Sequence, residues 1–110
     1  MTDEQTTVTR ARGAHRYEVE VDGETAGFTR YVDAGAHRIF FHTEIDDRFA
    51  GRGLASTLVS RALEDTRAAG LRIVPVCPYV ARYVKKHHDV DDLLDPVTPE
   101  ALAAVREARG

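Results

Sequence analysis

The chain has 110 residues, of which 43% are hydrophobic and 30% charged, as expected for one globular domain and not for a disordered chain. Fifteen Lys and Arg against eighteen Asp and Glu give a net charge of −3, which argues against general binding to nucleic acid or to a membrane surface. No apolar run approaches the roughly 20 residues of a membrane-spanning helix. Cys77 has no second cysteine in the chain to pair with, so we expect a cytoplasmic protein. We also expect a monomer or a small homo-oligomer.

An antiparallel meander of three strands is predicted for the first half of the chain. Residues 1–12 are mostly polar, and we expect a flexible terminus there. From His15 to Val21 apolar and polar residues alternate, which is typical of a half-buried strand. Asp22-Gly23 then favours a hairpin turn, a second strand runs from about Thr25 to Val32, and a third from about His37 to Ile45.

The hydrophobic period changes to that of a helix after Asp46, with Gly70 as its C-terminal cap. A short apolar strand over 71–76 completes a βαβ unit, so this strand should lie parallel to the third. Pro78 suits the first turn of the next helix, with Tyr79, Val80, Tyr83 and Val84 expected to be buried. A last helix is expected over 97–109, capped by Thr98. The fold class is therefore α+β, with an α/β-like mixed sheet in a single domain.

The loop Arg48-Phe49-Ala50-Gly51-Arg52-Gly53-Leu54-Ala55 joins the third strand to the long helix. Glycines two residues apart let the backbone approach a ligand and leave N–H groups pointing outward at the positive end of the helix dipole. Arg48 and Arg52 would add contacts to a phosphate. The alternative is a turn whose glycines only allow helix and sheet to pack. The spacing matches neither a dinucleotide fingerprint nor a Walker loop.

This loop resembles the Arg/Gln-x-x-Gly-x-Gly/Ala pyrophosphate loop of the GNAT N-acetyltransferase superfamily, here Arg48-x-x-Gly51-x-Gly53. Together with His42-Thr43-Glu44-Ile45 before it and Pro75-x-Cys77-Pro78-Tyr79-Val80-x-x-Tyr83 after it, the pattern is similar to a compact single-domain branch of that superfamily. The resemblance implies a GNAT-like fold that transfers acetyl from acetyl-CoA to an amine. The donor-binding residues that it implies are Ile45, Arg48, Ala50, Gly51, Arg52, Gly53, Leu54, Ala55 and Cys77.

The chain departs from that branch in several places. His88 follows His87 where the branch has Pro, Val90 stands where it often has Tyr, and Ala50 replaces a common basic residue. The helices that larger members insert after their first strand are missing. Since those helices usually help to form the acceptor pocket, the resemblance does not carry over an acceptor.

Two side chains near the end of the third strand are candidates for acid–base chemistry. Glu44 lies on the strand face opposite Ile45, and related enzymes often use a carboxylate on this strand as base. The other interpretation is an ion-paired surface residue. His42 shares that face, and a histidine titrates in a useful range. The other interpretation, which we favour, is a structural or surface histidine.

Cys77 lies where a strand gives way to a helix, a place that lowers the pKa of a thiol. It is interpreted as a nucleophile that forms an acetyl-thioester, as a neighbour of the cofactor, or as a buried small hydrophobe. Tyr83 resembles the general acid on the corresponding helix of the superfamily, but its register is off by about one residue, so core packing is an equal alternative.

Charged side chains follow Cys77 along the chain. Arg82, Lys85 and Lys86 form a basic patch that either contacts the cofactor's ribose phosphate, contacts an acidic partner, or is only a solvated helix face. The cluster from His87 to Asp92 lacks metal-ligand spacing, and no metal is expected. The sequence thus predicts an acetyl-CoA-dependent N-acetyltransferase acting on an amine, possibly on a protein or peptide. The alternative is a non-catalytic module that binds CoA or another protein.

Overall fold

The computed structural model describes residues 5–109, and of Arg12 it describes the backbone but not the side chain. Its centre is a five-stranded sheet in the order β1-β2-β3-β4-β5. β1 to β4 are antiparallel neighbours, and β5 lies parallel to β4. The strands are β1 (Thr6–Ala11), β2 (Arg16–Val21), β3 (Glu24–Ala34), β4 (His37–Ile45) and β5 (Arg72–Pro75).

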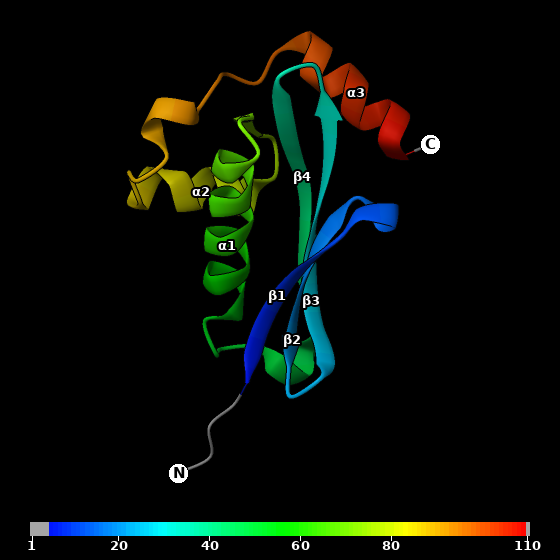
Figure 1. The fold of residues 1–110 in the computed structure, drawn as a ribbon, viewed down its shortest axis with the longest axis vertical. Helices are drawn as coiled ribbons and strands as arrows, with labels where there is room; N and C mark the ends of the chain where they lie inside the picture. Colours follow the sequence, from blue (N-terminus) through cyan, green and yellow to red (C-terminus); the bar gives the residue numbers. More distant parts are fainter. Residues whose placement is uncertain (1–4, 110) are drawn as a thin grey trace.

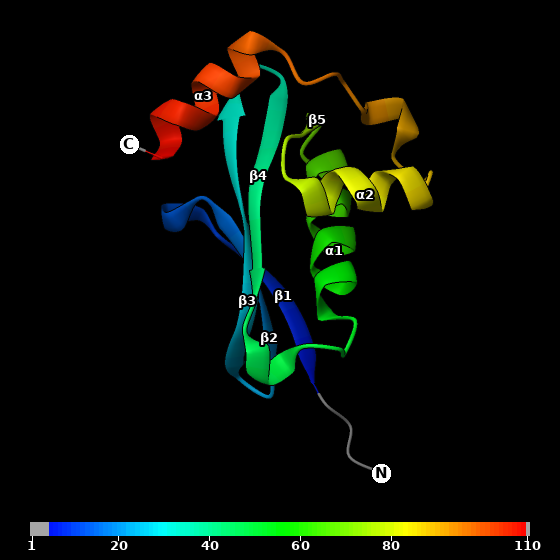
Figure 2. The same cartoon turned by 180° about the vertical axis from the view of Figure 1, so that it is seen from behind.

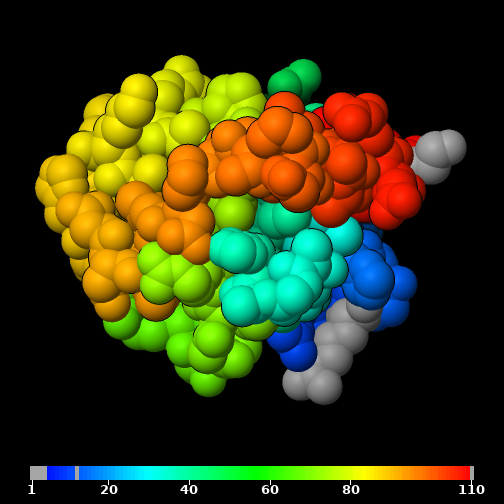
Figure 3. All heavy atoms as spheres, turned by 90° about the horizontal axis from the view of Figure 1, so that it is seen from above, coloured from blue at the N-terminus to red at the C-terminus, as the bar shows by residue number. Residues whose placement is uncertain are grey.

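Helices cover both faces of the sheet (Figure 1). α1 (Leu54–Ala68) and α2 (Pro78–Lys86) pack on one face, and α3 (Pro99–Arg109) packs across the upper part of the other. Figure 2 shows the sheet and the helices on its two faces from behind. Figure 3 shows α3 lying beside the turn between β3 and β4. The core is divided accordingly, because Phe40 belongs to the cluster under α1 and α2 whereas Phe41 belongs to the cluster under α3.

The predicted meander and βαβ unit are confirmed. Gly70 ends α1 with a φ of 74°, and its N–H donates to the carbonyl of Arg67 at 3.0 Å. Pro78 is the first residue of α2. Thr98 caps α3 by accepting a hydrogen bond from the N–H of Ala101 at 3.1 Å. Capping and turn residues thus set these boundaries locally.

The N-terminal prediction is wrong for the described part of that segment, because residues 6–11 form β1, paired with β2 from Thr6↔Val21 to Ala11↔Arg16. A strand at the edge of a sheet needs one partner for its backbone and few buried side chains, and β-branched Thr favours the extended conformation. Val8 alone packs against the main core from this strand. Residues 1–4, also predicted to be flexible, lie outside the described residues.

A β-bulge in β4 changes which side chains face the helices. Tyr31 pairs with Phe40 and Arg30 pairs with His42, so Phe41 is the extra residue. A bulge of this kind reverses the alternation of the residues that follow. Ile45 and Thr43 therefore face α1 and α2, although Ile39 and Phe41 face α3. The regular alternation expected of the third strand, over about His37 to Ile45, therefore does not hold across Phe41.

β4 and β5 separate halfway along β4. Their pairing runs from His37↔Arg72 to Phe40↔Pro75, and the N–H of Cys77 makes a last hydrogen bond to the carbonyl of Phe40 at 2.8 Å. The chain then enters α2. The segment from Phe41 to Ile45 keeps its pairing with β3 but has no strand on its other side among the described residues.

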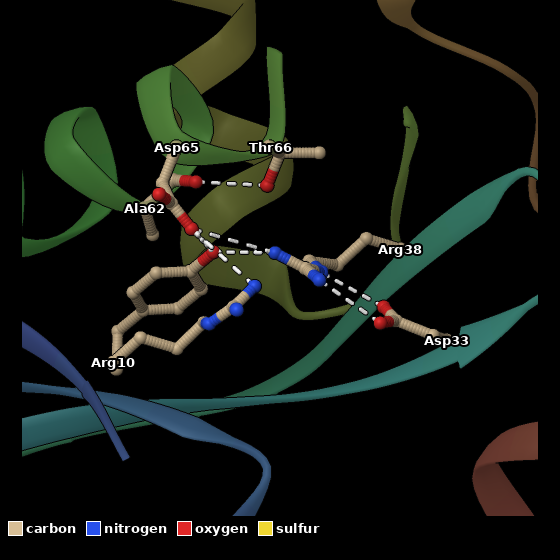
Figure 4. A network of polar contacts seen from close by, with 7 residues as sticks. Arg10, Asp33, Arg38, Ala62, Asp65 and Thr66 are labelled. Carbon is tan, nitrogen blue, oxygen red and sulfur yellow. Dashed lines mark hydrogen bonds and ion pairs between the residues drawn. The ribbon is translucent and has the colours of Figure 1, made fainter. Parts of the chain in front are cut away.

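A buried polar network fixes the C-terminal end of α1 against the sheet (Figure 4). Arg38 is 3% exposed, donates two hydrogen bonds to Asp33 at 2.8 and 2.9 Å and one to the hydroxyl of Tyr17 at 2.6 Å. Tyr17 in turn donates to Asp65 of α1 at 2.6 Å.

No helix of the described chain is long and apolar enough to cross a membrane.

Candidate functional site

The N-terminus of α1 is open to solvent. Gly51 and Gly53 have φ angles of 80° and 72°, in the left-handed region that favours glycine. Gly53 is the N-cap, no side chain caps the helix, and its first turn has no acidic residue. A Cβ atom at either glycine would meet nothing within 4 Å, so the glycines serve the turn and not a close contact within the protein. The positive end of the helix dipole is thus free to receive an anion.

Phe49 anchors the loop in front of this helix. It is 8% exposed and belongs to the main core, and the guanidinium groups of Arg48 and Arg52 each lie 5.3 Å from its ring centre. Leu54 is buried in the same core, Ala55 is half-buried and Ala50 is exposed. The loop therefore has a fixed base and an exposed rim.

Arg48 is already held by carboxylates. Its Nη2 lies 2.7 Å from Glu24 and its Nε 3.4 Å from Asp46, and hydrogen bonds to these two groups raise its pKa. The loop carbonyls and Asp46 also define a 3-10 turn, since Asp46 accepts a hydrogen bond from the N–H of Arg48 at 2.9 Å. A phosphate at the helix end would have to compete with Glu24 for this side chain.

Cys77 is the N-cap of α2 and lies where β4 and β5 separate. Cys77 is 3% exposed, and its Sγ lies 3.3 Å from the Oγ1 of Thr43. Thr43 also shares a hydrogen bond of 2.9 Å with the buried Thr29. The thiol is therefore the end of a short hydroxyl chain on the helix-facing side of the sheet.

Glu44 and His42 lie on the opposite face of β4 from Cys77. Their side chains are 62% and 43% exposed, with Oε2 of Glu44 3.7 Å from Nε2 of His42. The His42 ring is 6.0 Å from that of Phe28 on the same face. The predicted base and its histidine neighbour thus form one pair, and the thiol is separated from them by the sheet.

Tyr83 lies six residues after Cys77, a rise of about 9 Å along the axis of α2. It is 9% exposed, and its ring stacks on that of His87 with 4.2 Å between centres. The structure therefore brings together Thr43 and Cys77, and Glu44 and His42, whereas the ring contact of Tyr83 is with His87. Tyr79 is only half-buried, contrary to its predicted burial.

Sequence reasoning missed Thr29 and Thr43. Both are strand residues on the face toward the helices, and the bulge at Phe41 puts Thr43 there. One signal could have found them: two threonines directly opposite each other on neighbouring strands, both on the face that packs against the core.

The acidic segment after α2 serves the fold. Arg67 of α1 donates two hydrogen bonds to Asp92, at 3.1 and 2.8 Å, and His88 contacts Asp91 at 3.0 Å. Within residues 5–109, no three His, Cys, Asp or Glu side chains are grouped so that they could hold a metal ion.

A mixed sheet whose β4 and β5 separate next to a glycine-flanked, uncapped helix N-terminus has the architecture of the GNAT acetyltransferases. The chain belongs to the GCN5-related N-acetyl-transferase family, whose model matches residues 16–93. It is therefore an N-acetyltransferase by family, and that family generally uses acetyl-CoA as its donor.

A solved structure supports the fold. A GCN5-like candidate N-acetyltransferase from Staphylococcus aureus, determined by NMR, has a TM-score of 0.63 at 15% identity, over 84% of this chain and 91% of that one. An aminoglycoside acetyltransferase from an uncultured soil metagenomic sample, in complex with sisomicin, has a TM-score of 0.47 at 8% identity, over 86% of this chain and 56% of that one. No curated protein matches the sequence.

Proposed function

We propose that this protein transfers an acetyl group from acetyl-CoA to an amine on a protein or peptide. The observation that carries the proposal is the uncapped N-terminus of α1 behind Gly51 and Gly53, on the same side of the sheet as the separation of β4 from β5. The donor's pyrophosphate binds at the helix N-terminus, contacted by the backbone of Ala50 to Ala55 and by Arg48 and Arg52. Its pantetheine arm passes Ile45 and reaches Cys77.

The thioester is held beside the free edge of β4. In an antiparallel pair, alternate peptide groups point away from the partner strand, so those of residues 41–45 that do not bond β3 are available to the donor. An N–H group there would hydrogen bond the carbonyl oxygen as negative charge develops on it.

The reaction is a direct transfer in this proposal. The neutral amine attacks the thioester carbonyl carbon, the carbon–sulfur bond breaks, and the CoA thiolate leaves and takes up a proton from solvent. Glu44 accepts the proton lost by the amine, and His42 at 3.7 Å passes it to solvent. Cys77 is a neighbour of the thioester, oriented by Thr43, and not a nucleophile, because its thiol is buried and faces away from Glu44.

An acceptor on a larger molecule fits the open surface around Glu44. The hollow beside it, of about 550 Å³, is bounded by Arg16, Phe28, Glu44, Asp46 and Asp47. In the described chain, α3 covers only the upper part of this face of the sheet, and α1 lies on the opposite face (Figure 2). A small amine would have few walls to enclose it, whereas the side chain of a lysine on a partner protein brings its own surface. Acetylation restricted to small free amines would contradict this acceptor class.

Donor binding and catalysis are tested separately. Isothermal titration with acetyl-CoA measures binding, and transfer to lysine-containing peptides is followed by mass spectrometry. We expect Glu44→Gln to reduce kcat at least tenfold without changing donor affinity, and Glu20→Gln, the matched control on β2, to change neither. Equal losses of kcat and donor affinity in Glu44→Gln would exclude its role as base.

The role of Cys77 is tested by intact-protein mass spectrometry after incubation with acetyl-CoA. We expect no acetyl adduct on the wild type, and activity retained in Cys77→Ala. An adduct that is absent from Cys77→Ser, with loss of activity in both variants, would replace direct transfer by an acetyl-enzyme mechanism.

A further inference from the structure

A hollow of about 350 Å³ lies between the first turn of α1 and the outer side of α2. α2 contributes almost all of its lining, and α1 contributes one hydroxyl group. The lining residues are Ser56, Tyr79, Arg82, Tyr83, Lys85, Lys86 and His87.

The charge of this hollow is unbalanced. Arg82, Lys85 and Lys86 line it, and no carboxylate does. In the part of the chain that the structure describes, none of these three forms an ion pair, whereas Arg38, Arg48, Arg67 and Arg72 are each held by Asp or Glu. Positive charge without a counter-charge in a concave site favours an anionic ligand.

The walls of the hollow are aromatic. The rings of Tyr83 and His87 stack with an angle of 21° between their planes, and the guanidinium of Arg82 lies 5.8 Å from the ring centre of Tyr79. The hydroxyl of Tyr79 lies 3.5 Å from that of Ser56. Flat apolar groups beside cations suit a ligand that combines a planar base with a phosphate.

The position of the hollow relative to the helix N-terminus identifies that ligand. Ser56 follows Gly53 by three residues, a rise of about 5 Å along α1. In CoA, the pyrophosphate is joined directly to a ribose that carries adenine and a 3′-phosphate. A donor whose pyrophosphate is at Gly51 and Gly53 therefore has its 3′-phosphoadenosine within reach of α2.

We propose that this hollow binds the 3′-phosphoadenosine end of the acetyl donor and makes the enzyme require the 3′-phosphate. Lys85, Lys86 and Arg82 bind the phosphate, and the rings of Tyr79 and Tyr83 contact the base. The inference rests on the proposed function. In this proposal, residues of α2 select the donor by its 3′-phosphate. Arg48 cannot make that selection alone, because it is paired with Glu24 and Asp46.

The experiment compares CoA with 3′-dephospho-CoA by isothermal titration, on the wild type and on the double variant Lys85→Gln/Lys86→Gln. The wild type should bind CoA at least tenfold more tightly. The double variant should lose most of that preference while its affinity for 3′-dephospho-CoA stays unchanged. Arg61→Gln/Arg106→Gln, which removes two exposed charges outside the hollow, is the matched control and should keep the preference.

The outcomes separate this inference from the proposed function. Equal binding of both ligands by the wild type would overturn the role of the hollow and leave donor binding intact. A preference that survives in the double variant and in Arg82→Gln would place the 3′-phosphate elsewhere and would also overturn it. If the wild type bound neither ligand, the proposed function itself would be wrong.

Discussion

The two ends of α1 are built in opposite ways. At the C-terminal end, Thr66 is fully buried and donates to the carbonyl of Ala62 at 2.8 Å, and Asp65 accepts the hydroxyl of Tyr17 at 2.6 Å. At the N-terminal end, Gly53 offers no side chain, and the preceding residues are exposed. One end has its polar groups satisfied within the protein, and at the other end no side chain caps the N–H groups of the helix.

This contrast separates stability from binding along a single helix. A satisfied buried network orients α1 on the sheet, which in turn sets the position of the uncapped end. A side-chain N-cap such as Ser, Asp or Asn in extended backbone would occupy the N–H groups that an anion needs, whereas Gly53, with a φ of 72°, has no side chain to occupy them. We therefore expect substitutions at the C-terminal end to change stability and substitutions at the N-terminal end to change donor binding.

The largest effect is expected from Arg38→Ala. It removes a buried side chain that donates three hydrogen bonds to Tyr17 and Asp33 and whose guanidinium lies over the ring of Tyr31. We expect a loss of about 4 kcal/mol in the free energy of unfolding from these contacts together. Urea denaturation measures it. Arg30→Ala, at a half-buried arginine stacked on Phe41, is the control and should cost less than about 1 kcal/mol. Similar losses would show that the network does not stabilise this end of α1.

Alkaline pH should weaken the same end. Burial, together with the hydrogen bond to Asp65, raises the pKa of Tyr17 to about 12, against about 10 in an unfolded chain. Between these two pKa values the folded state keeps the phenolic proton that the unfolded state loses. The contribution of Tyr17 to the free energy of unfolding is therefore complete below about pH 10, and it declines by roughly 3 kcal/mol as the pH rises to 12. Urea titrations across this range should show that decline, and Tyr17→Phe should reduce it. An unchanged slope in Tyr17→Phe would contradict the assignment.

A matched pair of glycines tests the comparison directly. Gly53 and Gly70 flank α1 with φ angles of 72° and 74°, both are exposed, and a Cβ at either would contact nothing within 4 Å. Alanine at each should therefore cost about 1 kcal/mol of stability through backbone strain. Only Gly53→Ala should also reduce acetyl-CoA affinity, by about tenfold, because the strained turn moves the N–H groups at the helix end. Equal affinities of the two variants in isothermal titration would refute an anion site there.

Local patterns predicted much of the fold, and contacts between distant segments account for the rest. The period of residues 54–69, Asp22-Gly23 and Pro78 each mark a boundary through their own conformational preferences. The bulge at Phe41 depends on how two strands align, and it decides that Thr43 faces Cys77. The burial of Arg38 likewise could not be predicted from the residues next to it in the sequence. Its partners Tyr17 and Asp33, and the adjoining Asp65, come from three different elements.

The same limit applies to the candidate site. The glycine loop could be predicted because Gly51 and Gly53 stand where a strand ends and a helix begins, and the structure has an uncapped helix end there. The sequence also placed Glu44 opposite Ile45. It gave no sign that Glu24, twenty-four residues before Arg48, holds that arginine, since an ion pair between two loops depends on the β2–β3 hairpin reaching the end of β4.

The smallest effect is expected from releasing Arg48. Glu24→Gln removes the carboxylate 2.7 Å from its Nη2 and leaves Asp46 as the remaining partner. An exposed ion pair contributes little to stability, at most about 1 kcal/mol, so unfolding should hardly change. Acetyl-CoA should bind about twofold more tightly, because the phosphate no longer competes with Glu24 for the guanidinium. Glu64→Gln, an exposed acidic residue of α1, controls for the change in net charge. If both variants gained affinity equally, the gain would reflect the overall charge of the protein. A gain confined to Glu24→Gln would mean that Glu24 competes with the donor's phosphate for Arg48 at the open end of α1.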